Sequence, residues 1–340
     1  MRDRKKQTPA DPRRLIELID GFASCRVAVF GDLIVDEFIY GEIARVSREA
    51  PVLILNYDST EIVAGGAGNA ARNVAALGGK PAVIGLAGRD EAGERLVAVL
   101  DGMDAAGVVR PQAYRTPTKT RILAGGIHSA KQQVVRIDRA AAGRSGESHR
   151  ESVEGKLVRA AARCDALLVS DYGSGLVSPQ LVARARKAMR RGAPLLVDSR
   201  YSLLGFRGIT TCTPNESEVE QLYGIKIGEN LRVLERAGRD LLVQTRAQAV
   251  LITRGSRGMA LFERDRPTAH VPIHGSDQIA DVTGAGDTVI ATMTLALAAG
   301  ATFVEATHLA NYAGGIVVMK RGTATVSAGE LRAAVLSDLG

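Results

Sequence analysis

The chain has 340 residues, of which 46% are hydrophobic and 24% are charged, a composition typical of globular proteins with one large α/β domain or two smaller ones. Aromatic residues make up only 4% and tryptophan is absent, so the core must be aliphatic. The net charge of +7 is spread along the chain, with dense patches only at Arg2–Lys6 and Arg184–Arg191, and no nucleic-acid module is recognisable, so we expect anionic small molecules rather than nucleic acid as partners.

The first residues and the cysteines indicate a cellular compartment. Residues 1–12 carry charge and proline without an apolar run, which predicts a disordered lead and no secretion signal. No later run reaches the length of a membrane span. Three widely separated cysteines without metal-ligand spacing predict buried free thiols. We therefore expect a soluble, cytoplasmic protein.

Short apolar runs alternate with helical stretches along most of the remaining chain. Strands are predicted at Arg26–Phe30, Pro81–Leu86, Ala166–Val169, Pro194–Val197, Ile209–Cys212 and Ala249–Thr253. Helices are predicted at Arg13–Phe22, Asn69–Leu77, Glu91–Ala106, Arg150–Ala162, Pro179–Arg191, Glu216–Tyr223 and Leu231–Thr245. This alternation predicts an α/β fold with a mostly parallel central sheet, helices on both faces, and ligands at the carboxyl ends of the strands.

Two regions, about 38–57 and 119–137, break the alternation. Both carry short alternating polar and apolar stretches without a helical period. We interpret them as a small antiparallel β lid beside the main sheet. Because a small sheet is marginally stable alone, the lid is suited to cover a substrate or to pair with a second subunit.

The most informative motif is Asp281-Val282-Thr283-Gly284-Ala285-Gly286-Asp287, which the apolar run Thr288–Ala298 follows at once. Unpaired amides at a glycine-rich helix start can hold an anion. An aspartate in the same turn is a candidate for accepting a proton from an incoming hydroxyl. The motif therefore predicts phosphoryl transfer to an alcohol.

Four other segments carry weaker signals, each with a structural alternative. Gly65-Gly66-Ala67-Gly68-Asn69 allows close backbone approach to a ligand, although a tight turn is the default interpretation of such a run. Asp32 and Asp36 follow the first strand and suit sugar hydroxyls, or a helix cap and a surface acid. Asn215 and Glu218 share one face of a helix start and could hold water around Mg²⁺, but capping is the simpler reading. The run 253–258 forms either a turn between strands or a floor for a nucleotide.

Taken in this order, the glycine loop, the Asn-x-x-Glu pair and the final motif resemble the PfkB/ribokinase family of carbohydrate kinases over about residues 25–335. The resemblance implies a ribokinase-like fold with a single domain over 13–340, and a kinase that uses ATP and Mg²⁺ and, as often in this family, K⁺. It implies Asp287 as the general base and the amides of Gly284, Ala285 and Gly286 as an anion hole. The positions implied for the sugar are Asp32, Asp36, Gly65, Gly66 and Asn69. Those implied for the nucleotide are Asn215, Glu218, Thr253, Gly255, Gly258 and Asn311. Asn215 and Glu218 would also hold Mg²⁺ through water, and Asp281 and Thr283 would contribute to a K⁺ site.

Within the family, the chain is most similar to heptose 7-phosphate kinases. The likeness is carried by segments 47–52, 118–121, 133–138, 170–173 and 213–215. It implies phosphorylation of the anomeric hydroxyl of D-glycero-β-D-manno-heptose 7-phosphate, as in lipopolysaccharide core biosynthesis. Candidates for the substrate site are Lys119, Arg121, Arg136, Asp171 and Arg200, with Arg136 the strongest cation for the phosphate.

One departure and several alternatives remain. Heptose kinases usually read Asp-Pro-Lys where this chain has Asp198-Ser199-Arg200, and arginine differs from lysine in reach and geometry. Another sugar, sugar phosphate or nucleoside is the alternative substrate, and a non-catalytic binding regulator is an alternative of another class. No His-x-x-His element follows Val326, so we expect a stand-alone kinase. The resemblance also implies a homodimer formed through the lid.

Overall fold

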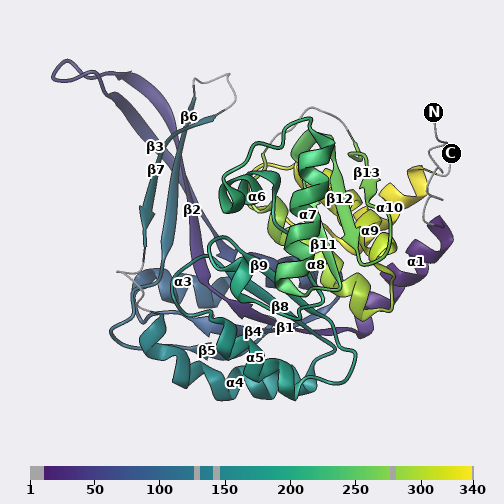
Figure 1. Cartoon of the computed structure of the whole chain (residues 1–340). Coiled ribbons are helices and arrows are strands. Elements are labelled where there is room, and N and C mark those ends of the chain that lie inside the picture. Colours follow the sequence, from purple (N-terminus) through teal and green to yellow (C-terminus); the bar gives the residue numbers. More distant parts are fainter. Residues whose placement is uncertain (1–10, 126–130, 141–145, 276–280, 339–340) are drawn as a thin grey trace.

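A nine-stranded sheet forms the centre of the computed structural model, which describes residues 11–125, 131–140, 146–275 and 281–338 (Figure 1). Its strands follow the order β13-β12-β11-β10-β9-β8-β1-β4-β5. They are β1 (Arg26–Gly31), β4 (Lys80–Leu86), β5 (Asp104–Val109), β8 (Ala166–Asp171), β9 (Leu195–Ser199), β10 (Thr211–Cys212), β11 (Ala249–Thr253), β12 (Met259–Glu263) and β13 (Ala269–Val271). Neighbours from β11 to β5 are parallel, and β12 and β13 extend one edge antiparallel. The predicted mostly parallel sheet is confirmed.

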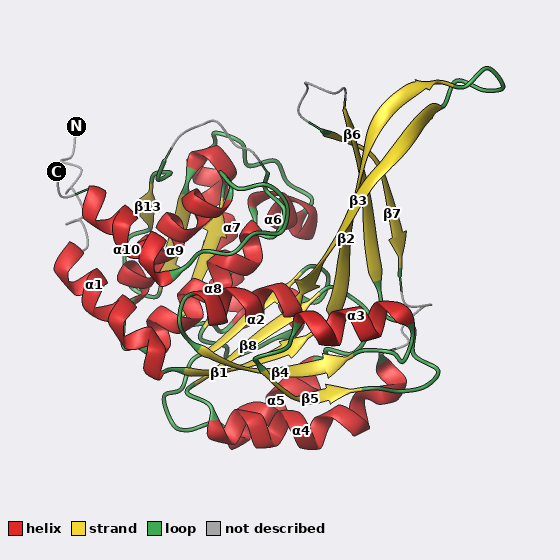
Figure 2. Cartoon of the chain, turned by 180° about the vertical axis from the view of Figure 1, so that it is seen from behind, coloured by secondary structure: helices red, strands yellow, loops and turns green. Residues whose placement is uncertain are grey.

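Helices cover both faces of this sheet, as Figure 2 shows from behind. One face carries α1 (Pro12–Gly21), α2 (Ala67–Ala76), α3 (Glu91–Val99), α8 (Ala285–Ala298), α9 (Phe303–Val317) and α10 (Ala328–Ser337). The other carries α4 (Arg150–Arg163), α5 (Pro179–Ala188), α6 (Glu216–Tyr223) and α7 (Leu231–Thr245). In β1, Val27 and Val29 point to the first face while Ala28 and Phe30 point to the second. Strands buried on both faces read as continuous apolar runs, which is why the sequence revealed them.

A second, four-stranded sheet forms the lid, which projects away from the central sheet in both views (Figures 1 and 2). It consists of β2 (Leu33–Val46), β3 (Leu53–Gly66), β6 (Thr118–Gly125) and β7 (Gln132–Arg139), in the order β3-β2-β6-β7. The two outer pairs are antiparallel, whereas β2 and β6 pair in parallel. Because β2 starts just after β1 and β3 leads directly into α2, the base of the lid meets the carboxyl ends of the central strands.

Several elements differ from the sequence predictions. The helix predicted over Glu91–Ala106 ends at Val99, and β5 begins at Asp104. Gly102, with φ of 82°, adopts a left-handed conformation between them and ends the helical path. Strands β12 and β13 and helices α9 and α10 had no counterpart among the predicted elements. Of the predicted disordered lead, residues 1–10 lie outside the described residues, and Asp11 caps α1 through the Arg13 amide at 3.0 Å.

Two further findings concern helix length and the cysteines in the described part of the chain. None of its helices is both long enough and apolar enough to cross a lipid bilayer. Its three cysteines, Cys25, Cys164 and Cys212, are buried and unpaired, as their spacing predicted.

Candidate active site

The candidate site is a cavity of about 360 Å³ at the carboxyl ends of the central strands, beside the start of α8. It brings together residues that lie far apart in the sequence. Its lining includes Tyr172, Asp198, Arg200, Thr213, Asn215, Glu218, Thr253, Gly255, Gly258, Gly284, Ala285, Gly286, Asp287 and Asn311. The predicted nucleotide residues and the glycine-rich motif therefore share one cavity, at the position where parallel α/β sheets bind their ligands.

Asp287 is a buried carboxylate in the first turn of α8, with 3% of its surface exposed. Its Oδ2 accepts a hydrogen bond from Asn69 Nδ2 at 2.8 Å, and its Oδ1 accepts one from the Tyr172 hydroxyl at 3.2 Å. Burial raises the pKa of Asp287 to about 6, although both hydrogen bonds oppose that rise. The carboxylate is thus ionised at neutral pH yet basic enough to accept a proton.

Free backbone amides lie directly beside Asp287. Gly284 precedes α8 with φ of 78°, and the Ala285 amide donates to the Val282 carbonyl at 3.2 Å. The Gly286 and Asp287 amides have no hydrogen-bond acceptor among the residues that the structure describes. Apart from its chain neighbours and the nearby backbone of α8, no described atom lies within 4 Å of a Cβ built on Gly286, so a ligand has room there. The start of α8 is therefore able to bind an anion.

The glycine loop places Asn69 and Asp36 at the other side of the site. Gly66 adopts φ of 57° immediately before α2, and a Cβ on Gly65 would lie 2.3 Å from Asp36 Oδ2. Glycine is therefore favoured at Gly65, near the end of β3, by close approach to Asp36 rather than by a turn. Asp36 is buried, and its Oδ1 accepts a hydrogen bond from Arg121 Nη1 at 2.6 Å. Its Oδ2 accepts a longer hydrogen bond from the Thr323 hydroxyl at 3.5 Å, so both oxygens of this predicted sugar ligand already have a protein partner.

Asp32 and Asp171 hold the loop that carries Tyr172. Asp32 Oδ2 accepts hydrogen bonds from the amides of Tyr172 at 2.8 Å and Ser174 at 3.1 Å, and Oδ1 accepts one from the Ser174 hydroxyl. Asp171 accepts hydrogen bonds from the Gly173 amide at 3.0 Å and from the Ser199 hydroxyl at 2.7 Å. Burial raises the pKa of Asp32. In this structure both acids position the loop.

Two cations flank the ring of Tyr172. Lys119 Nζ lies 4.6 Å from the ring centroid and the Arg200 guanidinium carbon lies 4.4 Å from it, both within cation–π range. Burial and the neighbouring charge of Arg200 lower the pKa of Lys119. Arg136 instead donates to Asp138 Oδ1 at 2.7 Å on the exposed strand β7. Lys119 and Arg200 are therefore the candidate phosphate cations that the structure brings nearest to Tyr172.

Three carboxylates, Asp198, Glu218 and Asp287, line the cavity, and the charge of Arg200 acts on each of them. Burial, with the charges of Glu218 and Asp287, holds the pKa of Asp198 well above its usual range. Burial also raises the pKa of Glu218. Glu218 and Asn215 form a capping box at the start of α6, with reciprocal bonds of 2.9 Å. The capping interpretation therefore holds, while one Glu218 oxygen stays available to a ligand.

The remaining predicted ligand residues stabilise the surrounding loops. Asn311 Nδ2 donates to the Pro272 carbonyl at 2.9 Å. Asp281 accepts from the Thr283 amide at 2.9 Å and from the Gly322 amide at 3.1 Å. The first contact joins α9 to Pro272, and the Asp281 contacts join the residues just before α8 to Gly322. The described residues contain no group of three or more His, Cys, Asp or Glu side chains arranged to hold a metal directly.

Sequence reasoning did not assign Tyr172 or Asp198 to the site. Tyr172 lies inside a segment that carries the family likeness, and Asp198 begins the divergent Asp-Ser-Arg triplet. Tyr172 directly follows β8, and Asp198 lies near the end of β9. These positions were the available signal, because ligands bind at the carboxyl ends of such strands. Arg254, which stands between the cavity-lining residues Thr253 and Gly255, was also missed: it is buried and pairs with Glu216 at 2.7 Å.

Comparisons with known proteins agree with this geometry. A profile of the pfkB family carbohydrate kinases matches residues 26–328. The chain is 41% identical over 307 residues to a bifunctional protein HldE of Geobacter metallireducens, and 40% identical over 337 residues to one of Caulobacter vibrioides. These matches cover 89% and 96% of this chain but only 61% and 66% of the relatives' own length.

Solved structures show the same fold at low sequence identity. A crystal structure of phosphofructokinase-2 from Escherichia coli in complex with potassium gives a TM-score of 0.73 at 21% identity, covering 92% of this chain and 99% of that one. A structure of Arabidopsis thaliana ribokinase complexed with ribose and ATP gives a TM-score of 0.69 at 21% identity, covering 92% and 98%. The ribokinase-like fold is confirmed.

Proposed function

Because the chain belongs to the pfkB family of carbohydrate kinases, we propose that Asp287 is the general base that activates a sugar hydroxyl for phosphoryl transfer from ATP. The observation that carries this proposal is the buried Asp287 carboxylate beside free amides at the start of α8. A base with a pKa of about 6 is ionised at neutral pH and close to the pH at which it works.

The residues around Asp287 have distinct roles in the proposed reaction. Asn69 and Tyr172 orient the carboxylate, one on each oxygen, so that its remaining lone pairs face the acceptor hydroxyl. Of the amides predicted to form the anion hole, Gly284, Ala285 and Gly286, that of Ala285 already donates to Val282. The Gly286 amide and the next one, that of Asp287, would therefore face the transferred phosphoryl group, where donors contribute most as charge develops. The positive end of the α8 dipole adds to this stabilisation.

The acidic groups of the cavity fit a divalent cation bound through water. Asp198 and Glu218 are carboxylates whose ionised forms are disfavoured by burial, and a cation between them would relieve that cost. Mg²⁺ keeps several waters and takes few protein ligands, which agrees with the lack of a direct metal cage in the described part of the chain. When bound, Mg²⁺ would neutralise the phosphate charge. Asp281 and Thr283 would contribute to a K⁺ site near α8.

We propose heptose 7-phosphate as the acceptor, phosphorylated at its anomeric hydroxyl. The resemblance to heptose 7-phosphate kinases and the similarity to proteins named HldE support this substrate. Lys119 and Arg200 also support it, because two cations with no carboxylate partner in the described ranges flank Tyr172 near Asp287. Such cations suit the phosphate of a phosphorylated sugar. The reaction would take place in the cytoplasm, where ATP is supplied.

Purified protein incubated with ATP, Mg²⁺ and a panel of sugars and sugar phosphates tests the function. The proposal expects the highest kcat/KM with heptose 7-phosphate and phosphate transfer to its anomeric oxygen. Faster turnover of ribose, fructose, fructose phosphate or a nucleoside would replace the substrate but keep the kinase. ATP binding without transfer to any acceptor would favour a binding regulator instead.

The lid supports a homodimer. Eight large apolar side chains on the lid and its hairpin turn are at least 40% exposed. They are Ile43, Val46, Val52, Leu53, Tyr57, Val134, Val135 and Ile137. Exposed apolar side chains gathered on one small sheet favour an interaction site, and a second copy of the lid would cover some of them. Light scattering at working concentration should give twice the chain mass, and a monomer would contradict this arrangement.

A further inference from the structure

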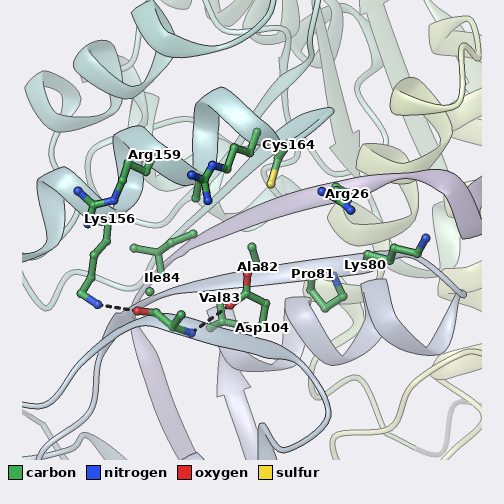
Figure 3. A pocket seen from close by; sticks show the side chains of 14 residues that line it. Arg26, Lys80, Pro81, Ala82, Val83, Ile84, Asp104, Lys156, Arg159 and Cys164 are labelled. Atoms are coloured by element: carbon green, nitrogen blue, oxygen red, sulfur yellow. Dashed lines mark hydrogen bonds between the residues drawn. The ribbon is translucent and has the colours of Figure 1, made fainter.

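A second cavity lies toward the amino ends of the central strands, whereas the candidate active site lies at their carboxyl ends. It has a volume of about 610 Å³ and is formed where β1, β4 and β5 begin and where α4 ends (Figure 3). The lining includes five cationic side chains and a single carboxylate, that of Asp104. The cations are Arg26, Lys80, Lys156, Arg159 and Arg163. This cavity therefore holds a large excess of positive charge.

Most of these cations lack an ionic partner. Within the described residues, Arg26, Lys80, Arg159 and Arg163 form no salt bridge, while Lys156 Nζ donates to the Ala106 carbonyl at 2.6 Å. The neighbouring acid Asp165 is already occupied. Its Oδ2 accepts from the Arg26 backbone amide at 2.9 Å, and its Oδ1 accepts from Arg190 at 2.9 Å. The unpaired cations repel one another unless an anion lies between them.

The floor of the cavity is apolar and the cations surround it. Pro81, Ala82, Ile84, Ala160 and Cys164 line the space between the charged side chains, and Figure 3 shows Lys156 and Arg159 on one side of this floor and Lys80 at the other end. A ligand that fits would carry several negative charges and an organic body. The volume is in the range of small-molecule sites, about 300–1,000 Å³.

We propose that this cavity binds a phosphorylated small molecule of about nucleotide size through several phosphate oxygens. Phosphate suits the site better than a lone carboxylate. Three arginines from two elements present planar guanidinium groups that match phosphate oxygens. The lysines add positive charge that complements the negative charge spread over several phosphate oxygens. The site shares no lining residue with the candidate active site and does not depend on the proposed kinase function.

The test uses inorganic tripolyphosphate as the probe, titrated calorimetrically into the full chain at low ionic strength without Mg²⁺. The test variant is Arg159→Ala/Arg163→Ala, which removes two exposed arginines one turn apart on α4. The matched control is Arg232→Ala/Arg236→Ala, which removes two exposed arginines with the same spacing on α7. Because the active site can also bind tripolyphosphate, the readout is each separate binding event rather than the total heat.

One binding event should be common to the wild type and the control and should weaken about tenfold or more in the test variant, because each charge-assisted phosphate contact is strong. Arg26→Ala/Lys80→Ala, which changes the other end of the cavity, should weaken the same event. Identical titrations of wild type and test variant would overturn the proposal. Weakening by the α4 variant alone would also overturn it, because binding would then lie on the helix surface rather than in the cavity. Circular dichroism and sugar phosphorylation should be unchanged in all variants.

Discussion

Tyr172→Phe gives a quantitative prediction about the proposed base. The substitution removes only the hydroxyl that donates to Asp287 Oδ1 at 3.2 Å and keeps the ring that Lys119 and Arg200 contact. A hydrogen bond to a charged group contributes about 1.5–3 kcal/mol, and the 3.2 Å length places this one at the low end. Since one pKa unit corresponds to about 1.4 kcal/mol, the pKa of Asp287 should rise by about one unit, from about 6 to about 7.

The assay is the pH dependence of kcat/KM, which reports the pKa values of the free enzyme. The proposed base must be ionised, so activity should fall as the pH drops through the pKa of Asp287. In the wild type the midpoint of this acid limb should lie near pH 6, and in Tyr172→Phe near pH 7. Activity well above both values should differ much less between the two proteins.

Tyr223→Phe is the matched control, because it removes a buried hydroxyl that has no hydrogen-bond partner in the described structure. Its acid limb should coincide with that of the wild type. The reasoning is refuted if the limb of Tyr172→Phe stays in place or moves to lower pH, since the hydroxyl would then not stabilise the ionised base.

Three further predictions concern the same site. Because burial raises the pKa of Asp287 from 3.8 to about 6, its charge opposes folding at neutral pH. Asp287→Asn should therefore raise the free energy of unfolding by up to about 3 kcal/mol above pH 6 and leave it unchanged below about pH 4. A difference in urea unfolding that does not depend on pH would contradict this. Lys119→Ala should raise KM for a phosphorylated sugar far more than for its unphosphorylated analogue. Arg136→Ala should have the same effect to a smaller extent, because Asp138 already binds its guanidinium. For either variant, equal effects on the two sugars would show that the residue does not bind the phosphate. Gly65→Ala should destabilise the protein by about 1–3 kcal/mol and raise KM for the sugar, because its Cβ would meet a carboxylate oxygen of Asp36. Unchanged thermal unfolding would show that the end of β3 and Asp36 relax freely around the added methyl group.

Local signals in the sequence located much of the site. The run from Asp281 to Asp287 combines glycines, an acid and an apolar helix, so both the helix start and the anion-binding amides could be anticipated. The central strands were recognisable because burial on both faces produces continuous apolar runs. The lid was recognisable because its two segments interrupt the alternation of strands and helices.

Contacts between distant residues could not be anticipated in the same way. The Asn69–Asp287 hydrogen bond joins residues that are 218 positions apart, and it exists only because α2 and α8 pack on the same face of the sheet. Asp32 and Asp171 look like ligands in sequence, but tertiary packing turns them toward backbone amides and hydroxyls. The cation–π contacts of Tyr172 likewise depend on the lid strand β6, which carries Lys119, and on the residue after β9, Arg200, which meet only in the folded chain.

The most direct measurement of the central claim is a single-turnover assay of phosphoryl transfer from ATP by Asp287→Asn, with ATP affinity measured on the same sample. Asparagine retains the shape of the side chain and loses the ability to accept the proton. The account predicts nearly unchanged ATP binding and a transfer rate lower by about 10²–10⁴-fold. A loss of less than about tenfold, with binding intact, would show that another group accepts the proton from the sugar.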